Sequence, residues 1–367
     1  MGASPCVFSE RIGVSTTTGG AFPNCPLPGA FVFGLAIALF AAAAKQIPAP
    51  PVSPATSLLP SGTKAFCELA YVTGGHERQK LDLFVPGQPG EPRPLLIWIH
   101  GGGWRQGDKA NCPPLRLGYT REGYAVASIN YRLSGDAIFP AQIEDCKAAI
   151  RWLRARAKPY RLDSKRFGVW GRSAGGHLVA LIGTSGGVPE FDVGADPDVS
   201  SRVQAVCDFS GPTDLLQIEA RAAPESLLRR DPPSSNEWRF IGGPIQDPKN
   251  RARVIQASPV THVSTDDPPF LIVHGDKDGA VPYRQSELLY AALKRAGIPV
   301  HFHTIKGMVH GFVAAGQGLN FSGPEIPALA RTFFDHHLLG KPTAAARWPA
   351  AMTSASEVQP DSVPPNP

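Results

Sequence analysis

Three segments of the sequence combine residue types that together can cleave an ester or amide bond. Ser173 lies in GRSAGG at 171–176, which fits the G-x-S-x-G pattern of a nucleophilic serine. Asp276 and Asp278 lie in HGDKDGAVP, and His310 lies in GMVHGF. A serine hydroxyl needs a base that accepts its proton, and a histidine base needs a carboxylate that holds its tautomer. The chain order serine, aspartate, histidine therefore indicates nucleophilic acyl transfer.

A second glycine-rich segment, HGGGW beginning at His100, follows the apolar run PLLIWI. Consecutive glycines leave their backbone N–H groups uncovered, so these groups can point at a ligand oxygen. With the amide of Ala174 they can form an oxyanion hole, in which each donor contributes roughly 2.7–4 kcal/mol in the transition state. We expect Trp104 to line the acyl pocket and His100 to anchor the loop by hydrogen bonds.

Ten histidines compete for the role of base. His310 stands out because it lies in a loop just after the last predicted strand, VHFHTI. His301 and His303 alternate on that strand, and they have no third ligand that would complete a metal site. For the acid we favour Asp278, which lies deeper in its loop, with Asp276 as the alternative.

Unbroken apolar runs predict the strands that must position these residues. Runs of four to seven residues bounded by Gly or Pro are typical of strands buried on both faces. Such runs occupy 94–99, 124–129, 166–170, 203–209 and 270–273. Helix patterns at 140–157 and 282–296 lie between them, which predicts a mostly parallel α/β sheet with helices on both faces. Alternating residues at 67–72 and 80–85 predict two antiparallel edge strands.

The regions outside these strands predict the domain boundaries. We expect a folded domain over 63–340, in which residues 211–258 interrupt the strand–helix alternation with charged and proline-containing segments. An insertion of this length favours a cap or lid, and a solvated surface insertion is the alternative. Residues 45–62 are a proline-rich linker, and 341–367 have the composition of a disordered tail.

The N-terminal region contains an apolar run, GAFVFGLAIALFAAAA, at 29–44. It is shorter than the roughly 20 residues of a membrane-spanning helix and ends in small side chains, as the core of a signal peptide does. We therefore expect residues 1–44 to direct export, which makes the protein secreted or periplasmic without stable membrane insertion after cleavage. An uncleaved membrane anchor is the alternative.

Charge and cysteine content narrow the possible partners. Lys and Arg number 36 and Asp and Glu 31, and the net charge of +5 is spread along the chain without a basic block. This argues against a nucleic-acid partner, which requires clustered positive charge. Of the six cysteines, none has metal-ligand spacing, and only Cys67 and Cys112 are considered as a disulfide pair.

The segments that contain these residues resemble an α/β-hydrolase of the HGGGW esterase and lipase group. The similar text is IWIHGGGWRQGDK, NYRLSGDAIFPAQIEDCKAAIRWLRA, RFGVWGRSAGGHLVALIGT, HGDKDGAVP and GMVHGF, within about 65–340. Within this group, the sequence resembles the feruloyl-esterase-like carboxylesterase branch that bifidobacterial enzymes typify. The resemblance implies a serine esterase without cofactor or metal, acting on short-chain or hydroxycinnamoyl esters, either small molecules or linked to polysaccharide.

The resemblance also assigns roles to individual residues. Ser173 is the implied nucleophile, Asp278 the acid and His310 the base. The implied oxyanion donors are the amides of Gly102, Gly103 and Ala174. The chain departs from the group at Arg172, where a small residue is common, and this changes the charge near the entrance. Two alternatives remain: an amide hydrolase such as an arylformamidase or peptidase with the same triad, and a catalytically inactive binding protein.

Overall fold

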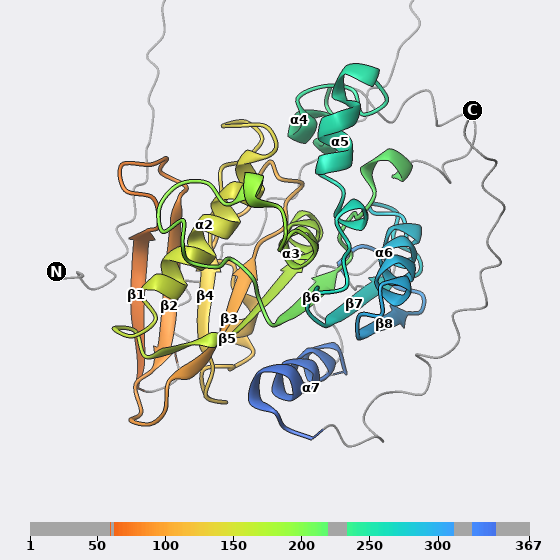
Figure 1. Cartoon of the computed structure of the whole chain (residues 1–367). Coiled ribbons are helices and arrows are strands. Elements are labelled where there is room, and N and C mark those ends of the chain that lie inside the picture. The colour runs from red at the N-terminus through yellow and green to blue at the C-terminus, as the bar shows by residue number, and fades with distance from the viewer. Residues whose placement is uncertain (1–58, 60–61, 219–232, 312–324, 343–367) are drawn as a thin grey trace, which may run out of the picture. The chain divides into compact units, whose positions relative to one another are not determined.

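A mixed β-sheet of eight strands forms the centre of the protein, as its computed structural model shows (Figure 1). The structure describes residue 59 and residues 62–218, 233–311 and 325–342. The expected leader at 1–44 lies outside these residues, as do nearly all of the expected linker at 45–62 and of the expected tail at 341–367.

The strands alternate with helices along the chain. They are β1 (Thr63–Ala70), β2 (Lys80–Pro86), β3 (Arg93–Ile99), β4 (Ala125–Ile129), β5 (Leu162–Arg172), β6 (Ala205–Phe209), β7 (Phe270–Gly275) and β8 (Val300–Ile305). Their order in the sheet is β1-β2-β4-β3-β5-β6-β7-β8. β1 and β2 pair antiparallel with their neighbours, and the six strands β3 to β8 run parallel to one another. The parallel strands therefore end at one common edge, where α/β proteins place their sites.

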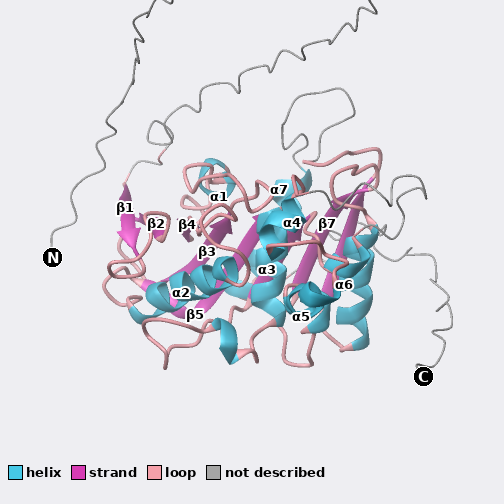
Figure 2. Cartoon of the chain, turned by 90° about the horizontal axis from the view of Figure 1, so that it is seen from above, coloured by secondary structure: helices cyan, strands magenta, loops and turns pink. Residues whose placement is uncertain are grey.

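Helices cover both faces of this sheet. They are α1 (Pro113–Arg116), α2 (Ala141–Ala155), α3 (Ala174–Thr184), α4 (Asn236–Ile241), α5 (Arg251–Gln256), α6 (Arg284–Arg295) and α7 (Glu325–Leu339). In Figure 2, α2, α3 and α6 lie on one side of the strands, and α1 and α7 lie on the other. The predicted doubly wound α/β architecture is thus confirmed.

The alternation of side chains along β3 explains why both faces need a helix layer. Leu95, Ile97 and Ile99 belong to the apolar cluster that includes α2, α3 and α6. Leu96 and Trp98, which point the other way, belong to the cluster that includes α7. Since each face buries apolar side chains, the strand sequence is an unbroken apolar run.

Most strands lie within two residues of their predicted bounds, but β1 and β5 each begin four residues earlier because strand pairing extends them. β1 occupies Thr63–Ala70 rather than the predicted 67–72, and it pairs with β2 around an irregularity between Phe66 and Leu69. β5 starts at Leu162, which pairs with Arg93 of β3, rather than at the predicted 166. These pairings depend on the partner strand and leave no trace in the local apolar pattern.

The insertion at 211–258 contains α4 and α5, which lie together above α3 in Figure 1. α4 begins because the Ser235 side chain accepts a hydrogen bond from the Trp238 N–H at 3.1 Å. It ends at Gly242, whose φ of 81° suits the left-handed cap of a helix. This short helix carries Asn236 and Phe240 toward the end of β5, as described below.

The cysteines test one further expectation. The disulfide considered between Cys67 and Cys112 is wrong, because Cys112 is a free thiol. Cys112 is buried beneath α1, and this burial raises its pKa to about 12. Among the residues that the structure describes, no helix combines the length and apolar character needed to cross a bilayer.

Candidate active site

Ser173 occupies the turn between β5 and α3 in a backbone conformation that side chains rarely adopt. Its φ is 58° and its ψ is −125°, a region that glycine favours. The conformation is held from both sides, because the Ser173 N–H donates to the Phe209 carbonyl at 2.8 Å and the His177 N–H donates to the Ser173 carbonyl at 2.9 Å. The turn therefore presents the serine beyond the end of the strand.

The glycines of this turn allow the strand and the helix to approach closely. A Cβ atom on Gly175 would lie 2.1 Å from the Ile99 carbonyl oxygen of β3, and one on Gly171 would lie 2.2 Å from the Gly175 carbonyl oxygen. Both distances are far below van der Waals contact, and the opposing atoms belong to the backbone. Only glycine fits at these two positions.

His310 and Asp278 form a hydrogen-bonded pair after the last two strands. His310 Nδ1 lies 2.7 Å from Asp278 Oδ2. The Asp278 side chain is fully buried, whereas that of His310 is 24% exposed. Because Nδ1 donates to the carboxylate, the other nitrogen of the ring, Nε2, is left to accept a proton.

A second histidine, His274 at the end of β7, also contacts this carboxylate. His274 Nε2 lies 3.2 Å from Asp278 Oδ2 and 3.1 Å from the Val281 carbonyl oxygen. Its Nδ1 lies 2.7 Å from Ser286 Oγ of α6. Since Nε2 faces two acceptors, it carries the hydrogen, and the Ser286 hydroxyl donates to Nδ1.

The surroundings of Asp278 favour its charged form. Burial alone would raise the pKa of this carboxyl, but the hydrogen bonds from His274 and His310 hold it well below its usual range. The N–H groups of Ala280 and Val281 also donate to its second oxygen, each at 2.9 Å. Asp278 is therefore a fixed anion next to His310.

Asp276, the alternative acid, and the two histidines of β8 do not line the cavity of Ser173 and His310. Asp276 accepts the Gly307 N–H at 2.6 Å and so fastens the turn that follows β8. His301 and His303 lie on β8 itself, and burial lowers the pKa of both imidazoles. Within the described ranges, no group of three or more His, Cys, Asp or Glu residues could hold a metal ion.

The HGGGW loop leaves the end of β3 with an unusual run of positive φ angles. They are 111° at Gly102, 60° at Gly103 and 55° at Trp104. Among the described residues, the N–H groups of Gly102, Gly103 and Ala174 donate no hydrogen bond to another protein atom. These three amides are therefore available to an oxygen atom placed next to Ser173.

Trp104 connects this loop to α3 and to the insertion. Its side chain stacks on Phe240 of α4 with ring centroids 4.4 Å apart, and its Nε1 donates to His177 Nδ1 at 3.2 Å. His177 Nε2 in turn donates to the Ala257 carbonyl at 2.7 Å. Burial lowers the pKa of His177 to about 4, so the imidazole stays neutral in this chain of contacts.

Ser173, His310 and the HGGGW loop line one cavity of about 360 Å³. It brings Ser173 and His310 together with the HGGGW loop and with two residues of α4, although they lie far apart in the sequence. Its lining comprises Gly102, Gly103, Trp104, Arg105, Gln106, Arg172, Ser173, Ala174, Pro212, Asn236, Glu237, Ala280, Val281 and His310. The contribution of α4 had no signal in the sequence beyond the length of the insertion.

A polar network that sequence reasoning missed supports the HGGGW loop from behind. Arg78, in the β1–β2 connection, donates to the Gly107 carbonyl at 2.8 Å and to the Tyr131 carbonyl at 2.9 Å. It also lies 3.3 Å from His100 Nε2. The Tyr131 hydroxyl donates to the His100 carbonyl at 2.9 Å, and the two rings stack. His100 thus anchors the loop, and its burial lowers its pKa to about 4.

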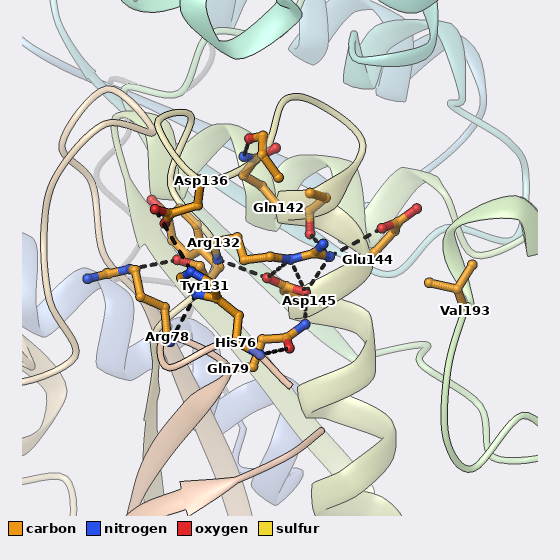
Figure 3. Close-up of polar contacts among 12 residues, drawn as sticks. His76, Arg78, Gln79, Tyr131, Arg132, Asp136, Gln142, Glu144, Asp145 and Val193 are labelled. Carbon is orange, nitrogen blue, oxygen red and sulfur yellow. Dashed lines mark hydrogen bonds and ion pairs between the residues drawn. The ribbon is translucent and has the colours of Figure 1, made fainter. Parts of the chain in front are cut away.

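The same network continues to α2 through Asp145 (Figure 3). This carboxylate accepts hydrogen bonds from Arg132 Nη2 at 2.8 Å and from Gln79 Nε2 at 2.7 Å. Its side chain is 1% exposed, so the two partners replace the water that it loses on burial. The network fixes the segment after β4 to both α2 and the loop that precedes β2.

Comparison with known proteins finds similarity to esterases. A family model described as BD-FAE matches residues 81–293, more than half of the chain. The probable carboxylic ester hydrolase LipM of Mycobacterium tuberculosis is 30% identical over 61% of this chain and 50% of its own length. Esterase LipQ of the same organism is 32% identical over 63% of this chain and 53% of its own. The chain thus spans about half the length of these curated relatives.

Solved structures of esterases have the same fold. A truncated carbohydrate esterase from gut microbiota superposes with a TM-score of 0.61 and 34% identity, covering 68% of this chain and 90% of that one. Est2 of Thermogutta terrifontis with propionate bound gives a TM-score of 0.58 and 25% identity, covering 74% and 93%. By its sequence and its α/β-hydrolase fold, the chain belongs to the BD-FAE family.

Proposed function

We propose that the protein is a carboxylic-ester hydrolase that uses Ser173 as nucleophile, His310 as base and Asp278 as acid. One observation carries this proposal: the His310–Asp278 pair, joined at 2.7 Å, lies at the same cavity as the strained Ser173. This arrangement matches the geometric roles of a serine triad, in which an anion orients the base beside the nucleophile. The esterase names of the relatives support the same reaction.

The first half of the reaction forms an acyl-enzyme. Ser173 Oγ attacks the ester carbonyl carbon while His310 Nε2 accepts its proton. The carbonyl oxygen becomes an oxyanion and accepts hydrogen bonds from backbone N–H groups. The proposed donors are Gly102, Gly103 and Ala174. The C–O bond of the ester then breaks, and His310 returns the proton to the departing alcohol.

The second half releases the acid. Water attacks the acyl carbonyl while His310 Nε2 accepts a proton from it, and Ser173 leaves with that proton as the tetrahedral intermediate collapses. Asp278 stays ionised throughout and stabilises the imidazolium form of His310. Its two further N–H donors and His274 hold the carboxylate in place for both halves.

For the substrate we propose short-chain or hydroxycinnamoyl esters, free or linked to polysaccharide. One of the similar solved proteins is a carbohydrate esterase, and another is an esterase with propionate bound. The cavity of about 360 Å³ suits a small acyl group better than a long fatty chain. Trp104 and Asn236 line this cavity and would contact the acyl or alcohol group.

Initial rates on four substrates test the proposal: 4-nitrophenyl acetate, 4-nitrophenyl decanoate, methyl ferulate and an aryl formamide. We expect turnover of the acetate or the ferulate, and its loss in Ser173→Ala. Asp278→Asn should lower kcat by about 10⁴-fold, because the base loses its orienting anion. Asp276→Asn is the matched control, because Asp276 lies in the same loop but does not contact His310. Its kcat should fall far less than that of Asp278→Asn.

The same set of measurements separates the alternatives. Turnover of the formamide alone would identify an amide hydrolase and contradict the proposal. Labelling with a fluorophosphonate, followed by peptide mass spectrometry, is expected to modify Ser173. A protein that neither takes up the label at Ser173 nor shows turnover dependent on Ser173 would also contradict the proposed ester hydrolysis.

A further inference from the structure

Arg172, which directly precedes the proposed nucleophile, has a half-buried guanidinium without a partner. Among the described residues, no carboxylate or carbonyl lies within ion-pair or hydrogen-bond distance of it. Burial lowers its pKa, and the only charge acting in the opposite sense is the more distant Asp278. An arginine nevertheless stays protonated at neutral pH, so this site contains a desolvated, uncompensated cation.

Other buried cations in the described part of the chain have oxygen partners. Arg154 donates to the Ser164 and Arg202 carbonyls, and three more contact carboxylates. Lys109 contacts Asp82 at 2.9 Å, and Arg151 contacts Asp192 at 2.7 Å. Arg132 contacts Asp145 at 2.8 Å. Buried charges are normally paired in this way because an unpaired one loses its hydration without compensation. Arg172 has no such partner among the described residues, and a bound anion would supply one.

Arg172 also lies where two cavities meet. One is the 360 Å³ cavity of Ser173 and His310. The other, of about 500 Å³, is also lined by residues of the HGGGW loop, and Arg172, Gly102 and Gln106 line both. A substrate bound at Ser173 can therefore extend past Gly102 into the larger cavity, with Arg172 at the junction.

The larger cavity favours an anion on balance. Arg116 lines it as a second cation, although its Nη1 also donates to Asn111 Oδ1 at 2.7 Å. Asp108 is the one acidic residue in its lining, and its oxygens accept hydrogen bonds from the Ala110 N–H and from Asn130 Nδ2, both at 2.8 Å. Asp108 is thus neutralised in part by its own loop, whereas Arg172 is not.

A neutral donor without a partner also belongs to a residue of this cavity. Trp98, a side chain 3% exposed, is one of the lining residues, and its buried Nε1 has no hydrogen-bond partner among the described residues. A carboxylate can accept from a guanidinium and from an indole N–H at the same time, since each of its oxygens has two lone pairs. This donor is an observation independent of the arginine.

We infer that Arg172 binds a carboxylate of the substrate, so that the preferred esters carry a negative charge near the scissile bond. This inference rests on the proposed ester hydrolysis. The carboxylate belongs either to the acid, as in a half-ester of a dicarboxylic acid, or to the alcohol, as in an ester of a uronic acid. A cavity of about 500 Å³ accommodates a sugar ring in addition to the carboxylate.

Two matched substrate pairs test the inference and distinguish the sources. Monomethyl succinate against methyl butyrate probes the acid side. An acetyl ester of methyl glucuronoside against that of methyl glucoside probes the alcohol side. For each pair we take the ratio of kcat/KM for the charged substrate to kcat/KM for the neutral one. This ratio is measured by pH-stat titration in wild type, Arg172→Gln and Arg172→Lys. Arg121→Gln is the control, because this exposed arginine precedes β4 at the opposite edge of the sheet.

We expect Arg172→Gln to lower the ratio by about tenfold or more in one pair, which is the size of one hydrogen bond between charged groups. Arg172→Lys should retain part of the ratio, and Arg121→Gln should leave it unchanged. Added salt should reduce the preference only in the proteins with a charge at position 172. Ratios that Arg172→Gln leaves unchanged in both pairs would overturn the inference.

A binding measurement keeps this test independent of the proposed reaction. In the Ser173→Ala background, thermal stabilisation by glucuronate or succinate is compared with that by glucose or butyramide. We expect stabilisation by one of the two anions and its loss when Arg172→Gln is added. If esters are not hydrolysed but the anion still binds through Arg172, the proposed function fails while the anion site stands. Equal binding with and without Arg172 would reject the site.

Discussion

The backbone strain at Ser173 predicts that replacing this serine by glycine stabilises the protein. A residue with a side chain at φ 58° and ψ −125° is held in a conformation that costs of order 1–3 kcal/mol. Glycine adopts this conformation without the cost. The backbone hydrogen bonds of Ser173, to Phe209 and from His177, remain possible in the variant.

The matched comparison is Ser173→Gly against Ser173→Ala, since both lack the hydroxyl and only alanine keeps the strain. Glycine also makes the unfolded chain more flexible, which removes about 0.4–1 kcal/mol of the gain. The net expectation is that Ser173→Gly unfolds with a free energy about 0.5–2 kcal/mol higher than Ser173→Ala. In a domain of this size each kcal/mol corresponds to roughly 2–4 °C in Tm.

Urea unfolding followed by circular dichroism, with both variants at the same pH and protein concentration, measures this difference. A Ser173→Ala protein as stable as Ser173→Gly would show that the turn stores no strain at this residue. A difference in the slope of unfolding with urea would instead report a change in the unfolded state.

Three further changes are predicted from contacts in the structure. Gly175→Ala should abolish folding, because the new Cβ would lie 2.1 Å from the Ile99 carbonyl oxygen. Gly187→Ala is the control and should fold, because open space surrounds Gly187. Soluble yield and circular dichroism measure whether each variant folds. Asp208 is fully buried, and burial raises its pKa to about 7. The stability that protonated Asp208 contributes is therefore present below about pH 4 and lost as the pH rises through 7. Asp208→Asn should have a free energy of unfolding up to about 4 kcal/mol higher than wild type at pH 8, and no such gain at pH 4. Urea unfolding at both pH values would measure this difference. His274→Gln should lower kcat by about tenfold with little change in KM, because Asp278 loses one of its two histidine donors; equal initial-rate parameters in variant and wild type would contradict this.

The parts of the site that follow from the sequence are those with local causes. The turn at Ser173 could be predicted because close approach of strand and helix demands glycine at fixed offsets. The buried strands could be predicted because burial on both faces makes their sequences continuously apolar. Depth in the loop, together with the family resemblance, favours Asp278 over Asp276, and in the structure it is Asp278 that contacts His310.

The rest depends on contacts between segments far apart in the chain. Arg78 contacts Gly107 and His100, and Asp145 contacts Gln79, at separations of 22 to 66 residues. Nothing in the local pattern around an arginine or an aspartate indicates such a partner. The extra strand residues of β1 have the same origin, since they are ordered by pairing with β2.

The contacts of His177 have a consequence for how this protein can diverge. Through Trp104 and Ala257, this imidazole joins the segment with the proposed oxyanion amides to the insertion, which lines the cavity of Ser173. Phe240 of the insertion stacks on the same tryptophan. The insertion is therefore not an independent module that can be exchanged to change substrate preference alone. A transplanted insertion that lacks an aromatic residue at 240, or that turns the backbone carbonyl of residue 257 away from His177, is expected to displace Trp104 and to slow acyl transfer on every ester.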